Sequence, residues 1–169
     1  MTLKKAAPKD AVATALNILK LREHTAFELT QKLEQRGYGQ DEIEDALAQC
    51  RAWNYLDDER AAAILARTLL RKGNGLQKIA YELKKRRVAG TIINKIMTEL
   101  AADTDQQAAA LALTRKKFLP ETTYPEIQRQ KGKIYRYLQN KGYTAEVIHE
   151  VFSGFYKGTA GSYNDIISK

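Results

Sequence analysis

Apolar residues recur near the start of this chain with the 3.6-residue period of an α-helix. They fall at i, i+3, i+4 and i+7 of a helix that begins at residue 11: Val12, Ala15, Leu16 and Leu19. A second helix starts where Thr25 and Glu28 have the spacing of a capping box. Leu29 and Leu33 give this second helix one apolar face. The periodicity therefore predicts two short amphipathic helices joined by a brief loop.

A turn and a third helix complete the pattern. Gly37 suits the left-handed position that ends many helices, and the next helix begins at Gln40 or Asp41. The apolar face of that helix consists of Ile43, Leu47 and Cys50. The sequence thus predicts a three-helix unit.

Two offsets reproduce this arrangement further along the chain. After 50 residues the apolar positions return as Ala62, Leu65, Ala66, Leu69, Ile79, Leu83, Ile93, Met97 and Leu100. After 105 residues they return as Ile134, Leu138, Ile148, Phe152 and Phe155, and the glycine turn returns as Gly142-Tyr143. The extra residues of the second offset fit the loop 119–126, which contains two of the three prolines.

An internal repeat of this kind predicts an all-α fold of three tandem three-helix, helix-turn-helix-like repeats. One repeat buries only a small core, so stacking on its neighbour would stabilise it. We expect an elongated array, straight or curved, made of three repeats at 11–56, 57–102 and 103–156. Residues 1–10 form an N-terminal extension in this interpretation, and residues 157–169 form a loose tail.

The composition favours α-helix and disfavours a membrane-spanning, secreted or disulfide-bonded protein. The prolines are Pro8, Pro120 and Pro125, so a long central stretch contains no helix breaker. No apolar run approaches the ~20 residues that span a bilayer, and the N-terminus lacks an apolar segment of signal-peptide length. The single cysteine, Cys50, cannot form an internal disulfide and fits a core position. We expect a soluble, cytoplasmic monomer that does not bind membranes.

The net charge of +8 is unevenly distributed and suggests an anionic partner. Residues 11–56 carry seven acidic against five basic side chains, whereas residues 57–100 carry ten basic against five acidic. Helix C-termini favour cations and explain part of this excess. Its clustering in the second and third repeats favours a shared binding surface. The candidate binding residues are Arg67, Arg71, Lys72, Lys78, Lys84, Lys85, Arg86, Arg87, Arg115, Lys116, Lys117, Arg129, Lys133, Arg136 and Lys141.

The sequence contains no constellation typical of an enzyme. Residues 73–75 (G-N-G) lack the strand that precedes a phosphate loop, and they fit a helix end and turn. His24 and His149 lie in different repeats, without partners at metal-ligand spacing. Residues 57–59 (D-D-E) stand at a helix start, where carboxylates favour the helix dipole. We therefore predict no catalytic residue, no metal and no cofactor.

A sequence-specific helix-turn-helix DNA reader is one alternative, because three short helices with a glycine turn suit that motif. Such a reader needs Arg, Lys, Asn or Gln on the exposed face of its groove helix. The third helices of the repeats instead carry mostly carboxylates: Asp41, Glu42, Glu44 and Asp45, then Glu99 with Lys95, then Glu146 and Glu150. Phosphates would repel two of these helices, which disfavours groove reading.

Three ordered motifs in residues 11–156 resemble the RecX family of bacterial recombination regulators. They are H-T at 24–25 through G-Y at 37–38, N-Y-L-D-D-E-R-A at 54–61, and the stretch from K-G-N-G at 72–75 to R-R-V at 86–88. Asn54 and Arg87 stand where the family has turn glycines, and Ala61 stands where it has phenylalanine. We interpret the central motif as structural, through Tyr55, Leu56, Asp57, Asp58 and Arg60.

The resemblance implies a non-enzymatic regulator of RecA, the strand-exchange ATPase that polymerises on single-stranded DNA. RecX-like proteins bind in the groove of that filament, inhibit its recombinase, ATPase and coprotease activities, and favour its disassembly. The implied partners are the RecA filament and single-stranded DNA. Double-stranded DNA is a further candidate partner. Two alternatives stay open: a non-specific nucleic-acid-binding module that does not need RecA, and a helical-repeat scaffold for a protein partner.

Overall fold

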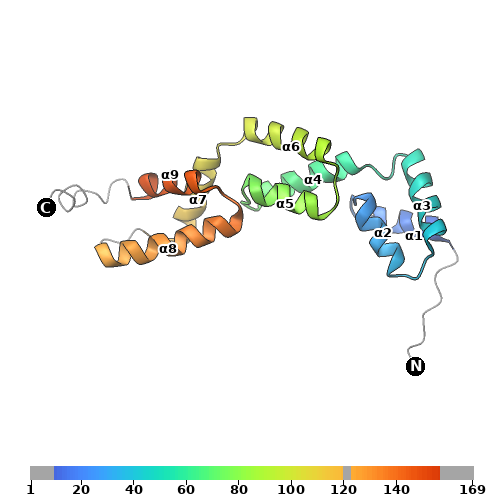
Figure 1. The fold of residues 1–169 in the computed structure, drawn as a ribbon, viewed down its shortest axis with the longest axis horizontal. Helices are drawn as coiled ribbons and strands as arrows, with labels where there is room; N and C mark the ends of the chain where they lie inside the picture. Colours follow the sequence, from blue (N-terminus) through green and yellow to red (C-terminus); the bar gives the residue numbers. More distant parts are fainter. Residues whose placement is uncertain (1–9, 120–122, 157–169) are drawn as a thin grey trace, which may run out of the picture. The chain divides into compact units, whose positions relative to one another are not determined.

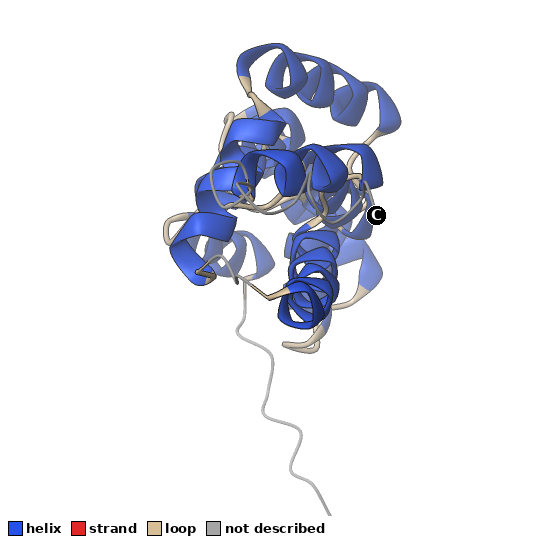
Figure 2. Cartoon of the chain, turned by 90° about the vertical axis from the view of Figure 1, so that its left-hand side faces the viewer, coloured by secondary structure: helices blue, strands red, loops and turns tan. Residues whose placement is uncertain are grey.

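The computed structural model describes residues 10–119 and 123–156, and these residues form helices joined by turns and loops (Figure 1, Figure 2). The helices are α1 (Ala11–Leu19), α2 (Ala26–Glu34), α3 (Gln40–Ala52), α4 (Asp58–Arg71), α5 (Leu76–Lys85), α6 (Gly90–Asp103), α7 (Gln106–Lys117), α8 (Tyr124–Lys141) and α9 (Ala145–Phe155). The expected extension before residue 10, the centre of the 119–126 loop and the expected tail lie outside the described residues.

The chain divides into two compact units. The first contains residues up to 67 together with 82–94, and the second contains 68–81 together with residues from 95 onward. In the first unit, α1, α2 and α3 pack on one another around a common core. In the second unit, α9 packs on both α7 and α8. Because α4, α5 and α6 each contribute to both units, the middle helices belong to neither unit alone.

The apolar positions that the repeat predicts are buried. Three equivalent sets have essentially no exposed side-chain area: Leu29, Ile79 and Ile134; Leu33, Leu83 and Leu138; Ile43, Ile93 and Ile148. Cys50 is also enclosed, at the position of Leu100 and Phe155, and burial raises the pKa of its thiol. The prediction of an all-α fold with three tandem three-helix repeats is confirmed.

The turn after the second helix of each repeat has the same left-handed geometry. The φ angle is 89° at Gly37, 53° at Arg87 and 86° at Gly142. The N–H of the following residue reaches back to close each turn: Tyr38 to the carbonyl of Leu33 at 3.4 Å, Val88 to Leu83 at 3.3 Å, and Tyr143 to Leu138 at 3.1 Å. This is the Schellman closure of a helix end. Arg87 adopts it without being glycine, and its guanidinium lies 4.7 Å from the centre of the Phe27 ring.

The first N–H groups of α5 donate to other helices of the second unit. The bonds run from Gly75 to the carbonyl of Lys141 at 2.8 Å, from Leu76 to Oε1 of Gln106 at 3.2 Å, and from Gln77 to the carbonyl of Gly142 at 3.3 Å. A helix start leaves such groups without partners inside the helix. These bonds therefore hold the beginning of α5 against the start of α7 and the turn after α8.

The first N–H group of α2 is satisfied in the equivalent way inside the first unit. Ala26 donates to Oδ1 of Asp58 at 2.7 Å. Ala26 and Leu76 are each the first residue of a second helix, and Asp58 and Gln106 are each the first residue of the next repeat's first helix. The same contact thus joins successive repeats twice, once with a carboxylate as acceptor and once with an amide.

Replacing Gly142 with alanine should destabilise the second unit strongly. A Cβ at Gly142 would overlap the Cβ and N of Lys78, whereas Gly37 has the same left-handed conformation and open space around it. Gly37→Ala should therefore cost about 1 kcal/mol, from backbone strain alone. Gly142→Ala should cost at least about 2 kcal/mol more, because the junction must also shift. Urea unfolding followed by circular dichroism measures both losses, and equal losses would show that the close approach at Gly142 is not there.

Candidate functional site

The central motif starts α4 and fixes the turn before it. Oδ1 of Asp57 accepts a hydrogen bond from the backbone N–H of Arg60 at 3.0 Å, so this carboxylate caps the helix. Asp58, the next residue, caps α2 instead, through Ala26. Leu56 is buried in the core of the first unit. Asp57 and Asp58 are therefore both engaged in holding helix starts.

Arg60 ties this turn to the loop before α2. Its Nε and one terminal nitrogen bind the two oxygens of Glu23 at 2.8 and 3.2 Å. The same terminal nitrogen donates to the carbonyls of Asn54 and Tyr55 at 3.1 and 3.4 Å. The hydrogen bond to Glu23 raises the pKa of Arg60. The arginine thus joins two loops that lie far apart in the sequence.

Glu28 forms ion pairs with the positively charged side chains around the start of α2. Its Oε1 lies 3.2 Å from a terminal nitrogen of Arg22 and 3.2 Å from Nε of Arg86, and its Oε2 accepts from the N–H of Thr25 at 3.1 Å. Burial alone would raise the pKa of Glu28, but these hydrogen bonds and charges outweigh it and lower the pKa. Arg86 also pairs with Glu82 at 2.7 Å. Arg86 therefore already pairs with two carboxylates inside the first unit. Its charge is compensated there, unlike that of an exposed cation at the surface.

The other candidate cations are mostly at the surface. The exposed ones are Arg67, Arg71, Lys72, Lys84, Lys85, Arg87, Arg115, Lys116, Lys117, Arg129, Lys133 and Arg136. Lys78 and Lys141 are partly buried. Nζ of Lys141 donates to the carbonyl of Lys72 at 3.1 Å, which places it at the junction between α4 and α8 in the second unit. Lys141 thus has a structural contact as well as a charge.

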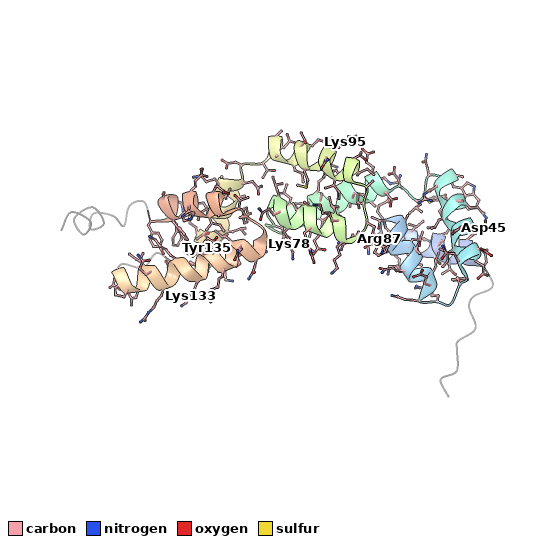
Figure 3. All side chains as sticks on the ribbon, viewed as in Figure 1. Asp45, Lys78, Arg87, Lys95, Lys133 and Tyr135 are labelled. Carbon is pink, nitrogen blue, oxygen red and sulfur yellow. The ribbon has the colours of Figure 1, made fainter. Side chains whose placement is uncertain are left out.

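The structure brings three of the exposed cations together at the end of α7 and along α8. An open depression of about 480 Å³ is lined there by Lys117, Phe118, Leu119, Glu126, Arg129, Gln130 and Lys133. Nζ of Lys117 lies 4.0 Å from the centre of the Tyr137 ring, and Phe118 packs edge-on against the same ring at 5.8 Å. Figure 3 shows Lys133 projecting from α8. Three cations against one carboxylate make this depression attractive to an anion.

Sequence reasoning missed Gln130, a buried polar residue beside this depression. Its Nε2 donates to the carbonyl of Leu119 at 2.6 Å, and its Oε1 accepts from the Tyr156 hydroxyl at 2.6 Å. These partners lie 11 and 26 residues away, so no local pattern indicates them. Phe118 could have been found, because it directly follows the basic run at 115–117.

The remaining residues that could bind a metal do not form a metal site among the residues that the structure describes. His24 is buried at the start of α2. In the described part of the chain, no group of three or more His, Cys, Asp or Glu side chains could hold a metal ion. The four carboxylates of α3 are exposed, and Asp45 is labelled among them in Figure 3. None of the helices within residues 10–119 and 123–156 is long and apolar enough to cross a membrane.

These features define a class of protein: a tandem array of three-helix repeats, joined by capped helix starts and presenting cations at its surface. Family models described as the first, second and third three-helix domains of RecX match residues 11–50, 57–97 and 103–152. The chain belongs to the RecX family of regulatory proteins.

Individual relatives agree with this assignment. The chain is 31% identical over 149 residues to the regulatory protein RecX of Syntrophotalea carbinolica, covering 87% of this chain and 97% of that protein. It is 37% identical over 139 residues to the regulatory protein RecX of Vibrio campbellii, covering 82% and 87%. A crystal structure of regulatory protein RecX has the same fold, with a TM-score of 0.72 at 22% identity over 85% of this chain and 71% of that one. RecX from Lactobacillus salivarius gives 0.67 at 21% identity, over 86% and 94%.

The buried imidazole of His24 predicts a pH dependence for the stability of the first unit. Nδ1 lies 2.8 Å from the carbonyl oxygen of Arg22, and because a carbonyl only accepts, Nδ1 carries the hydrogen. Burial is the largest influence and lowers the pKa of His24; the charges of Arg22 and Lys32 act in the same direction, while the hydrogen bond and Glu28 oppose it. The folded state therefore favours the neutral ring, and this stabilisation is lost as the pH falls below the unfolded value of about 6.5.

Between about pH 7.5 and pH 5.5, the free energy of unfolding of the first unit should decrease by at most about 1.4 kcal/mol per pH unit. Urea unfolding followed by the fluorescence of Trp53, which lies in this unit, measures the change. His24→Asn keeps a donor for the carbonyl of Arg22 and does not titrate, so its stability should vary less with pH. An identical pH profile in the variant would remove His24 as the cause.

Proposed function

We propose that this protein is a negative modulator of RecA, which binds RecA–DNA filaments in the filament groove and inhibits their recombinase, ATPase and coprotease activities. The observation that carries the proposal is the match to proteins named regulatory protein RecX along nearly their whole length, 97% in the case of Syntrophotalea carbinolica. The protein acts by stoichiometric binding in the cytoplasm, and it performs no reaction of its own.

The exposed cations support an anionic component of the binding surface. Lys117, Arg129 and Lys133 meet at one depression, where they could contact consecutive phosphates of a DNA strand. Phe118 lines the same depression and places an aromatic ring beside these cations, where a base could stack. Among the candidate cations, these three have the arrangement best suited to nucleic acid, whereas the charge of Arg86 is compensated by two carboxylates.

The mechanism that we propose is a bias between two filament states. The repeats, taken at 11–56, 57–102 and 103–156, contact neighbouring RecA protomers and bind the inactive geometry more tightly than the active one. A ligand shifts such an equilibrium only by its difference in affinity for the two states. Inhibition should therefore follow the ratio of this protein to RecA and need no turnover.

Hydrolysis of ATP by RecA on single-stranded DNA tests this proposal. Stoichiometric amounts of the protein should inhibit hydrolysis, and no inhibition at such amounts would contradict the proposal. The triple variant Lys117→Gln, Arg129→Gln, Lys133→Gln should inhibit less, because it lacks the cations of the depression. The matched control removes two exposed cations of the first repeat, Lys20→Gln and Arg36→Gln, and should inhibit like the unmodified protein.

A second candidate, a nucleic-acid-binding module that does not need RecA, is favoured by the same cations. It requires binding to naked DNA as tight as binding to the filament. The dependence of log affinity on log salt separates the contributions: losing three phosphate contacts with single-stranded DNA should flatten the slope by about 2. If naked DNA and the filament bind equally well, this second function replaces the first.

A further inference from the structure

The turn between α3 and α4 presents two large aromatic side chains to solvent. Trp53 is 51% exposed and Tyr55 is 56% exposed. Leu56, directly after them, is buried in the core of the first unit and anchors the segment. Two large exposed aromatics so close together are unusual on a surface where most apolar residues are covered.

The backbone beneath these aromatics is firmly held. The turn closes with the N–H groups of Tyr55 and Leu56 on the carbonyl of Cys50, at 2.9 and 3.1 Å. Asn54 has a φ of 59°, the left-handed conformation that lets the chain reverse. Arg60 also binds the carbonyls of Asn54 and Tyr55, while Glu23 holds its guanidinium. Little backbone entropy is left to lose on binding, so the turn is preorganised for contact.

The surroundings of this turn are acidic. Residues 41–59 contain seven carboxylates against the single cation Arg51. The carboxylates of α3 and that of Glu59 are exposed. Asp57 and Asp58 are partly buried and engaged in caps, yet they add to the negative potential. A polyanion such as DNA would be repelled here, whereas the arginine or lysine side chains of a protein would be attracted.

We propose that the Trp53–Tyr55 turn is a docking surface for a protein partner that presents arginine or lysine side chains. Trp and Tyr are the residues most often found at the energetic centres of protein interfaces, and their rings also attract cations. The proposal rests on the proposed function, because the RecA filament is the partner used to test it. In this proposal, the acidic, aromatic turn contacts protein, and the cations of the second unit contact nucleic acid.

The chain contains one tryptophan, so its emission reports on this turn alone. Biosynthetic replacement of Trp53 with 7-azatryptophan separates its signal from tryptophans of the partner, because the analogue is excited at longer wavelength. RecA filaments assembled on single-stranded DNA should shift its emission to the blue and protect it from acrylamide. The same single-stranded DNA without RecA should leave the emission unchanged. An equal shift with naked DNA would overturn the proposal.

The double variant Trp53→Ala, Tyr55→Ala supplies an independent readout. It should bind the filament at least tenfold more weakly and bind naked single-stranded DNA within twofold of the unmodified protein. Leu21→Ala is the matched control, because Leu21 is 84% exposed and lies in a different loop of the same unit. Circular dichroism checks that each variant is folded.

Failure of the docking surface can be distinguished from failure of the proposed function. If the unmodified protein neither binds nor inhibits the filament, the proposed function fails before any variant is made. If it inhibits, but the double variant inhibits equally and the emission does not move, only the docking surface is refuted. A shift that depends on the protein's own concentration, without RecA, would identify a second copy as the occupant and would also refute the proposal.

Discussion

Every repeat faces the same physical problem: a second helix whose first N–H groups have no acceptor within the helix. In the first two repeats, the structure satisfies some of these groups with atoms of the next repeat. Ala26 donates to Asp58 in the first unit, and Leu76 donates to Gln106 in the second. A helix that starts correctly is therefore also a helix that is docked, and each start is coupled to its neighbour. In this chain, Asp58 of the motif at 54–61 and Gly75 of the stretch at 72–88 take part in these starts.

The two junctions solve this problem with different chemistry. The first is rich in charge: Glu28 meets Arg22 and Arg86, and Arg60 meets Glu23. The second relies on close backbone approach at Gly142, where a side chain cannot fit. Asp57 and Asp58 of the central motif are thus engaged in caps, while Lys117 of α7 and Arg129 and Lys133 of α8 are exposed.

Local sequence patterns predicted most of the helices and buried positions, because periodicity and capping are short-range effects. The offset of 50 residues also places Arg87 at a turn that Gly37 occupies in the first repeat, and the structure shows the left-handed conformation there. The pairing of Arg86 with Glu28, 58 residues away, could not be predicted, because it depends on how two helices meet. For the same reason, the sequence could not separate Lys117 and Lys133 from the other candidate cations.

Hydrogen exchange at the start of α5 tests the central claim that docking completes the helix start. Free first-turn amides exchange rapidly, since only water accepts from them. The amides of Gly75, Leu76 and Gln77 should instead be protected to a degree comparable with Ile79, which bonds within the helix. Exchange of these three amides at the rate of an unstructured peptide, with Ile79 still protected, would show that the junction does not hold the helix start and would contradict the account.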